Sequence, residues 1–242
     1  MIAIKINDLR KEYRDVVAVD GIDLEIEEGE LFSLLGVNGA GKTTTIKMLS
    51  TLLKPTSGDA LVYGRSIVRE PDEVKNFIDI SMQETAVAKK LTVEENIDFY
   101  AKLSGQNKQE REETKKYIYK TFGLDAVAKK LASKLSGGWQ RKLSIALALA
   151  GKPKILFLDE PTLGLDVLAR REMWNTIKEL KKEMTVILTT HYMEEAEELS
   201  DRIGIMKDGK LLFVGTKKDL YETTGAKNVE EAFLHIVSGG ER

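Results

Sequence analysis

The chain has 242 residues and a mass of 27.1 kDa, which fits one α/β domain or one such domain with an inserted lobe. Its 37 basic and 39 acidic side chains give a net charge of −2, which argues against a broad nucleic-acid-binding face. Cysteine is absent, so a disulfide framework and a thiolate zinc site are both excluded.

Antiparallel strands are predicted near the N-terminus, because residues 2–6 and 16–26 alternate apolar and polar side chains. Tyr13 lies between these two segments. Its ring either packs on neighbouring residues or stacks on a nucleotide base, a contact that reads no sequence. The apolar run 30–35 predicts a buried strand, and residues 44–53 predict a helix.

Between that strand and that helix lies a glycine-rich loop, Gly36–Thr44, which fits the pattern G-x-x-x-x-G-K-[ST]. Phosphate groups need donors around them, so the backbone N–H groups of such a loop turn inward, and only residues without a Cβ tolerate that approach. The helix adds the positive end of its dipole, and Lys42 adds a full charge. Thr43 offers a hydroxyl to Mg²⁺. The predicted nucleotide-binding residues of this loop are Gly36, Asn38, Gly39, Ala40, Gly41, Lys42, Thr43 and Thr44.

From Glu84 to about Ala150 the pattern changes to helical periods rich in Lys and Glu, which predicts an inserted helical lobe. Thr92 and Glu95 form a predicted capping box at the start of its first helix. Residues 110–122 predict a second helix, which Gly123 ends.

The rest of the chain alternates between predicted strands and helices. Strands are predicted at 59–63, 77–82, 154–160, 185–190, 202–206 and 210–214, and helices at 167–183, 193–199, 217–223 and 229–237. Asp208-Gly209 is a strong hairpin signal between the last two strands. Strands that alternate with helices behind a phosphate-binding loop predict an α/β fold with a mainly parallel sheet.

Two carboxylates follow the buried strand that begins at residue 154. Asp159 ends this strand, where phosphate-loop enzymes place the carboxylate that holds the waters of Mg²⁺. Glu160 comes next and points to the other side of the strand end, where a carboxylate can take a proton from an attacking water. The alternative is that Asp159-Glu160-Pro161 simply ends a strand, and the phosphate-binding loop makes this the weaker interpretation.

A third cluster, Leu135-Ser136-Gly137-Gly138, precedes an apolar helix. Ser136 offers a hydroxyl, and the helix start offers free N–H groups and a dipole, which suits an anion. The alternative is a helix N-cap, since Ser is a preferred capping residue. Capping does not need two glycines, which weaken a helix start, so phosphate contact is the better explanation for Ser136, Gly137 and Gly138.

Together these motifs resemble the nucleotide-binding subunit of an ABC transporter, and the similarity covers about residues 2–237. The motifs that carry the resemblance are, in chain order, Tyr13 as the base-stacking aromatic, Gly36–Thr44 as Walker A, Gln83 as the Q-loop glutamine, Leu135–Gly138 as the signature, Ile155–Glu160 as Walker B, Leu163–Asp166 as the D-loop and His191 as the switch histidine. The run 189–198 and the ending 229–234 look like the branch of drug and polysaccharide exporters that includes daunorubicin-resistance ATPases.

The resemblance implies a P-loop NTPase core with an N-terminal antiparallel β subdomain and an inserted helical subdomain. It implies one ABC ATPase domain over residues 1–242, with the insert at about 84–150 and C-terminal helices at about 216–242. It further implies that two such domains meet head to tail around two ATP molecules. The Walker A loop of one copy then faces the signature of the other.

The resemblance also assigns roles to single residues. Glu160, His191 and Lys42 are expected to act in hydrolysis, with His191 on the γ-phosphate, and Mg²⁺ is expected to be held by Thr43, Gln83 and Asp159. Asp166 is expected to link the two nucleotide sites. Taken alone, His191 is more often a structural histidine and Asp166 more often a helix N-cap.

One residue departs from the family pattern. The family usually has Gln after the two signature glycines, whereas Trp139 stands here and is followed by Gln140. The indole either alters packing at the dimer seam or toward a membrane partner, or covers the core of the helical lobe. Both interpretations stay open. Trp174, on the helix after the D-loop, is expected to pack.

We expect an ATP-hydrolysing subunit, as a homodimer or paired with another ABC subunit, that drives a separate permease of an exporter. The longest apolar run, Ile145–Ala150, is far below the ~20 residues of a membrane span, so a cytoplasmic protein peripheral to the inner face of the membrane is expected. The alternatives are a soluble ABC ATPase of translation, repair or cluster assembly, and a nucleotide-binding regulator without hydrolysis. No nucleic-acid partner is expected.

Overall fold

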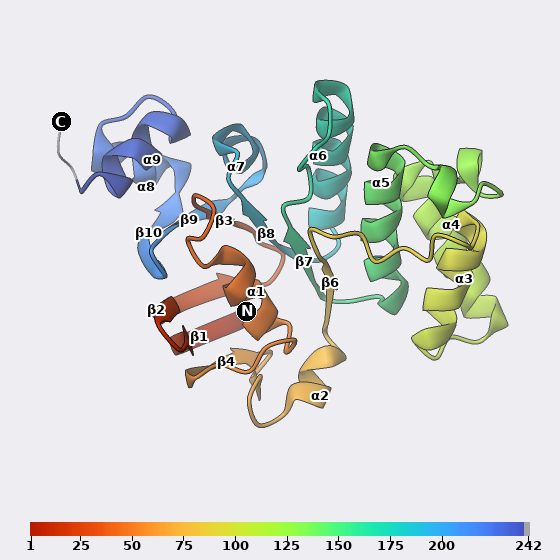
Figure 1. Ribbon diagram of the computed structural model, residues 1–242, viewed down its shortest axis with the longest axis horizontal. Helices are drawn as coiled ribbons and strands as arrows, with labels where there is room; N and C mark the ends of the chain where they lie inside the picture. The colour runs from red at the N-terminus through yellow and green to blue at the C-terminus, as the bar shows by residue number, and fades with distance from the viewer. Residues whose placement is uncertain (240–242) are drawn as a thin grey trace.

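The computed structural model describes residues 1–239, and two β-sheets organise them (Figure 1). The strands of the larger sheet are β3 (Leu31–Leu35), β6 (Ile78–Ser81), β7 (Ile155–Asp159), β8 (Thr185–Thr190), β9 (Arg202–Lys207) and β10 (Lys210–Thr216). Their order is β10-β9-β3-β8-β7-β6. All neighbours are parallel except β9 and β10, which form an antiparallel hairpin. The predictions of a mainly parallel sheet and of a hairpin at Asp208-Gly209 are therefore confirmed.

The central strands of this sheet are β3, β7 and β8, in which every residue is buried. A parallel strand covered on both faces reads as an almost continuous apolar run, which is the pattern that predicted them. Because these strands are parallel in register, their carboxyl ends meet at one edge of the sheet, which we call the carboxyl edge. The loops that follow β3, β6, β7 and β8 all leave from this edge.

The smaller sheet is antiparallel and is formed by strands from the first 66 residues. Its strands are β1 (Ile2–Tyr13), β2 (Val16–Glu27), β4 (Ser57–Val62) and β5 (Arg65–Ser66), in the order β2-β1-β4-β5. Helix α1 (Lys42–Leu49) shares one core with both sheets, since Ile46 packs in the same cluster as Ile4 and Phe157. The helix predicted over 44–53 ends at Leu49, because Thr51 takes a left-handed conformation (φ 61°) and turns the chain.

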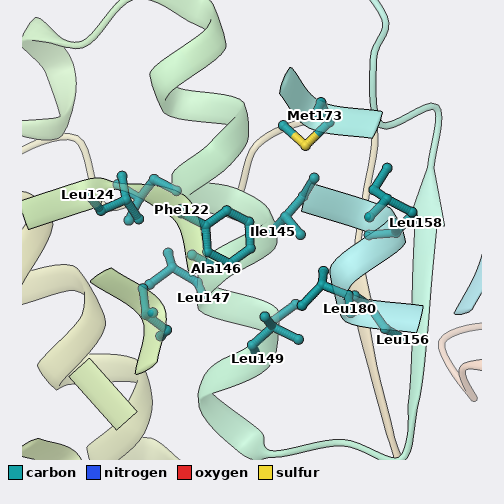
Figure 2. Packing of buried hydrophobic residues seen from close by; sticks show 14 of the residues in the cluster. Phe122, Leu124, Ile145, Ala146, Leu147, Leu149, Leu156, Leu158, Met173 and Leu180 are labelled. Carbon is teal, nitrogen blue, oxygen red and sulfur yellow. The ribbon is translucent and has the colours of Figure 1, made fainter. Parts of the chain in front are cut away.

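The inserted segment forms a lobe of three helices, α3 (Val93–Leu103), α4 (Lys108–Phe122) and α5 (Gly137–Ala148). The predicted capping box is confirmed, because the side chain of Thr92 accepts from the N–H of Glu95 and Glu95 reaches back. Gly123 ends α4 in the left-handed conformation, as predicted. Helix α5 buries its apolar face between the rest of the lobe and strand β7, so the lobe and the large sheet share a core (Figure 2).

The remaining helices are α2 (Pro71–Lys75), α6 (Val167–Lys181), α7 (Met193–Leu199), α8 (Lys217–Thr224) and α9 (Val229–Val237), with 3₁₀ turns at Leu124–Val127, Ala132–Lys134 and Leu149–Gly151. Helix α2 and the three 3₁₀ turns were not predicted, because five residues or fewer are too few to show a helical period. The lobe and the pair α8–α9 lie at opposite ends of the molecule (Figure 1). Within residues 1–239, no helix is long and apolar enough to cross a membrane.

Candidate functional site

A cavity of about 670 Å³ opens where the loops leave the carboxyl edge of the large sheet. Its wall includes most of the predicted nucleotide-binding and catalytic residues, although these come from segments as far apart in the sequence as Asn38 and His191. The residues that line it are Val16, Val17, Ala18, Asn38, Gly39, Ala40, Gly41, Lys42, Thr43, Thr44, Gln83, Glu160, Leu163, His191 and Asp208. A cavity of this size is in the range of small-molecule sites.

The loop Gly36–Thr44, which we call the phosphate loop, is pressed against two neighbouring strands. Gly41 has a φ of 106°, and a Cβ there would lie 2.3 Å from the carbonyl oxygen of Ala18 on β2. A Cβ on Gly36 would lie 2.4 Å from the carbonyl oxygen of Met206 on β9. Only glycine fits at either position, and the close approach holds the loop against β2 and β9.

Lys42 carries the positive charge of the loop, and its side chain is only 5% exposed. The ammonium donates to the carbonyl oxygens of Gly36 (2.7 Å) and Val37 (3.2 Å). It also lies 3.4 Å from Oε1 of Glu160. The charge is therefore held inside the loop and next to a carboxylate from the end of β7.

Thr43 and Asp159 bring a hydroxyl and a carboxylate into direct contact. Oγ1 of Thr43 donates to both carboxylate oxygens of Asp159, at 3.0 and 3.1 Å. Asp159 is fully buried, and the hydroxyl of Thr189 on β8 fixes its carboxylate at 2.6 Å. This pair fits Mg²⁺, which takes oxygen ligands and uses few protein carboxylates because it keeps waters and binds substrate phosphates. The side chain of Gln83 lines the same cavity and offers one more oxygen.

Glu160 bridges the phosphate loop and the loop after β8. Its carboxylate lies 2.8 Å from Nδ1 of His191 through Oε2, in addition to its contact with Lys42 through Oε1. The backbone of Glu160 is left-handed, with a φ of 49°, a conformation that costs energy for any residue other than glycine. Its N–H donates to the carbonyl oxygen of Thr189 (3.2 Å) and to its hydroxyl (3.1 Å). The side chain is buried, yet it reaches the cavity.

Another buried acid lies on α7, the helix that follows His191. Glu195 on α7 accepts from the hydroxyl of Thr162 (2.7 Å) and from the indole N–H of Trp174 (3.0 Å). Burial raises the pKa of its carboxyl group. Glu195 thereby joins the helix after His191 to the segment after Glu160 and to α6. Trp174 packs against the core, as expected.

Ser136, Gly137 and Gly138, which we call the signature tip, form the start of α5. Ser136 occupies the N-cap position, but its side chain accepts no hydrogen bond from the first turn. A Cβ added to Gly137 would have no heavy atom within 4 Å. The capping alternative is thus not realised. Within one chain, the signature tip does not line the 670 Å³ cavity, but lines a separate one of about 400 Å³ together with Asp166 and Trp139.

Four other predicted site residues do not line the larger cavity: Gly36, Asp159, Tyr13 and Asp166. Gly36 and Asp159 contact Lys42 and Thr43, which do line it. Tyr13 ends β1, is 46% exposed and has the ammonium of Lys11 5.1 Å from its ring centroid. Its partner across the sheet, Val16, lines the cavity, whereas Tyr13 is not among the lining residues of the described chain. The side chain of Asp166 caps α6 by accepting from the N–H of Ala169 at 2.9 Å.

Trp139 lies in the first turn of α5, half-buried against the core of the lobe. The ammonium of Lys142 lies 4.9 Å from its ring centroid and donates to Glu172 on α6 at 2.8 Å. These contacts support the interpretation that the indole covers the core. The ring also lines the cavity beside the signature tip, so the two expected roles are compatible.

No sequence pattern identifies four of the residues that line the larger cavity, Val16, Val17, Ala18 and Asp208. Asp208 lies at the tip of the β9–β10 hairpin, where the N–H of Gly209 donates to the carbonyl oxygen of Ala40 at 3.0 Å. In the sequence, Asp208-Gly209 signals only a turn. Its place beside the phosphate loop depends on β9 pairing with β3, which no local pattern reveals.

Comparisons with known proteins agree with this geometry. The family model described as ABC transporter matches residues 19–163. The daunorubicin/doxorubicin resistance ATP-binding protein DrrA of Streptomyces peucetius is 39% identical over 234 residues, which cover 96% of this chain and 71% of that protein. The dimeric structure of an ATP-binding cassette in a post-hydrolysis state, bound to ADP and Pi, has a TM-score of 0.79 at 27% identity, and the match covers 88% of this chain and 98% of that one.

A much longer relative also matches. ABC transporter A family member 7 of Dictyostelium discoideum is 42% identical over 222 residues, or 91% of this chain. The chain spans about a quarter of that relative's length, since the match covers 26% of it.

Proposed function

Because the chain belongs to the ATP-binding domains of ABC transporters, we propose that it closes on ATP with a second copy and drives a separate membrane permease of an exporter. The chain is an ATPase of this family with the P-loop NTPase fold. The observation that carries the proposal is the cavity in which Lys42, Thr43, Glu160 and His191 meet.

In the proposed reaction, Glu160 accepts the proton of the water that attacks the γ-phosphate. Its carboxylate reaches the cavity between Lys42 and His191, so a water between it and the phosphates would lie within hydrogen-bond reach. His191 holds Oε2 of this carboxylate and so orients it. Lys42 supplies positive charge where negative charge develops on the transferred group.

Mg²⁺ would be held by Thr43, Asp159 and Gln83, and when bound it supplies charge neutralisation on the phosphates. The contribution of the chain is the fixed geometry of these oxygens. Asp159 is held by Thr189, and Thr43 is the second residue of α1. The oxygens of Asp159 and Thr43 are therefore held next to each other.

The proposal of a second copy rests on the signature tip. The hydroxyl of Ser136 caps nothing, and Gly137 has open space beside it at a helix start, which favours an anion. Nothing within residues 1–239 brings a phosphate-binding loop to the signature tip, whereas a head-to-tail partner would. The similarity to a dimeric cassette bound to ADP and Pi supports this arrangement. Asp166, beside the signature tip, would then lie at the seam.

The exporter role is supported by relatives. DrrA, which this chain matches over 96% of its length, bears a name that combines ATP binding with daunorubicin/doxorubicin resistance. We propose that this chain works in the same way, at the inner face of the membrane and with a separate permease. Coexpression with a candidate permease should give a complex that copurifies and whose ATPase rate differs from that of the chain alone. A chain that elutes alone, with an unchanged rate, would contradict the permease proposal.

Replacement of Glu160 tests the proposed chemistry. Glu160→Gln keeps the size of the side chain but removes the base, so kcat should fall by about 10²- to 10⁴-fold while the Kd for ATP stays unchanged. Single-turnover hydrolysis and nucleotide titration measure the two quantities. Glu194→Gln is a matched control, because Glu194 is exposed and only three residues past His191. Near-normal hydrolysis in Glu160→Gln would reject the assignment.

A further inference from the structure

Arg141 buries its guanidinium between the signature helix and two loops of the nucleotide cavity. It lies in the second turn of α5 and is only 4% exposed. Its Nη1 donates to the carbonyl oxygens of Met82 (2.5 Å) and Gln83 (3.1 Å). Its Nη2 donates to the carbonyl oxygen of Asp159 (2.6 Å), and its Nε to that of Pro161 (2.9 Å). One side chain thus holds four main-chain carbonyl groups from two different loops.

The packing of α5 does not explain this charge. The apolar face of α5 is already buried through residues such as Leu143 and Ile145, which have no exposed surface. Arg141 forms no direct ion pair with an acidic side chain of the described chain. Burial lowers its pKa to about 10, although the nearby carboxylates of Asp159, Glu195 and Glu160 act to raise it, so the guanidinium stays charged at neutral pH. Burying such a charge is costly unless its hydrogen bonds are specific, as these four are.

Two of the four carbonyl groups flank Glu160. The Asp159 carbonyl belongs to the same peptide plane as the N–H of Glu160, so the orientation of this plane sets the φ of Glu160. The plane is held from both ends, because Arg141 binds its oxygen and Thr189 on β8 binds its N–H. The left-handed conformation of Glu160, with a φ of 49°, is therefore fixed by contacts on both sides.

The other two carbonyl groups belong to the loop that carries Gln83 into the same cavity. Arg141 therefore connects three parts of the site: helix α5, which begins at the signature tip, the loop after β6 that carries Gln83, and the backbone of Glu160. We propose that Arg141 is a positioning residue, which holds Glu160 in its left-handed conformation and ties that conformation to the position of α5. This inference rests on the proposed role of Glu160 as the base.

Arg141→Lys is the direct test. It keeps a positive charge, but a single ammonium cannot reach carbonyl groups on two loops as the planar guanidinium does. We expect kcat to fall by about 10²-fold, the size of effect that a 1 Å misplacement of a reacting group has, while the Kd for ATP changes less than about threefold. An unchanged kcat, or a loss that lies entirely in ATP binding, would overturn the proposal.

A double-mutant cycle separates positioning from a general structural role. If Arg141 acts through Glu160, Arg141→Lys should lower the single-turnover rate of the Glu160→Gln variant by less than about threefold. The same loss in both backgrounds would mean that Arg141 acts independently of Glu160, and would overturn the inference. If Glu160→Gln alone leaves hydrolysis intact, the proposed base is wrong, which is a distinguishable result.

Ser144→Ala is the matched control on the same helix. The hydroxyl of Ser144 lies 3.2 Å from that of Ser81, so this variant loosens the contact between α5 and β6 without touching the neighbours of Glu160. Its kcat should stay near that of the parent chain. An equal loss of kcat in Ser144→Ala would show that Arg141 acts by holding α5 in place and not by positioning Glu160. If Arg141→Lys does not fold, Arg141→Gln is tested in its place. If neither variant folds, Arg141 is required for folding, and the proposal is overturned.

Discussion

In the phosphate loop, the side chains of Lys42 and Thr43 have partners in the same chain, whereas at the signature tip the side chain of Ser136 has none among the described residues. The ammonium of Lys42 is held by two carbonyl groups and lies beside Glu160, and the hydroxyl of Thr43 is held by Asp159. The hydroxyl of Ser136 caps nothing, and Gly137 faces open space. Both regions are starts of helices next to glycines, so their chemistry is similar and their surroundings differ.

This difference shows which part of a composite site one copy can complete by itself. A buried polar group without a partner is costly, so the buried ammonium of Lys42 must be satisfied for the chain to fold. An exposed group is satisfied by water, so the signature tip is free to serve a second copy at no cost to the fold of the first. Variants of the first region should therefore change binding in each copy, and variants of the second should change only what two copies do together.

The largest effect in this comparison is expected from Lys42→Ala. The loss of a charge-assisted hydrogen bond to a phosphate costs about 1.5–3 kcal/mol, so the Kd for ATP should rise by about 10- to 100-fold. Nucleotide titration at concentrations that keep the chain monomeric measures this value. Lys47→Ala is the control, since Lys47 lies on the same helix but outside the cavity, and an equal loss there would contradict the assignment.

Ser136→Ala should have the next largest effect, and on a different property. ATP binding to one copy should be unchanged, and the free energy of unfolding should change by less than about 0.5 kcal/mol, because the side chain is exposed and caps nothing. Steady-state hydrolysis should fall by about tenfold, because the partner's phosphates lose a hydrogen bond.

Thr92→Ala should have the opposite effect to Ser136→Ala, a loss of stability rather than of hydrolysis. Thr92 is also an N-cap in the lobe, but it forms a complete capping box, so its loss should cost about 1 kcal/mol of stability with little change in hydrolysis. If Ser136→Ala destabilised the chain as much as Thr92→Ala does, Ser136 would be a cap after all.

The smallest effect is expected from Gly137→Ala on stability. A Cβ at this position meets nothing, and Ala favours a helix over Gly by up to about 1 kcal/mol, so thermal unfolding should not shift downward. Hydrolysis should nevertheless fall, because the added methyl group lies where the partner's phosphates approach. Hydrolysis at the parent rate across dimer-favouring concentrations would count against a shared site.

Local sequence patterns were sufficient for the parts of the molecule that depend on contiguous residues. The phosphate loop is one such part, because Gly36, Gly41, Lys42 and Thr43 stand at fixed spacings within nine consecutive residues. The backbone of Ala18 and Met206 that excludes a Cβ at the two glycines is known only from the structure. The capping box at Thr92, the left-handed end at Gly123 and the buried runs of β3, β7 and β8 are equally local. The short helix α2 and the end of α1 were not predicted, because a few residues carry too weak a period.

The contacts between distant residues of the site depend on the order of strands in the large sheet. No short sequence pattern encodes this order. The order brings the ends of β7 and β8 together, so that Glu160 meets His191 and Asp159 meets Thr189 across about 30 residues of sequence. It also places Asp208 beside the phosphate loop. The four carbonyl contacts of Arg141 could not be predicted, because they use main-chain groups that every residue possesses. Side-chain chemistry can be read along a chain, whereas contacts between distant backbone groups exist only once the chain has folded.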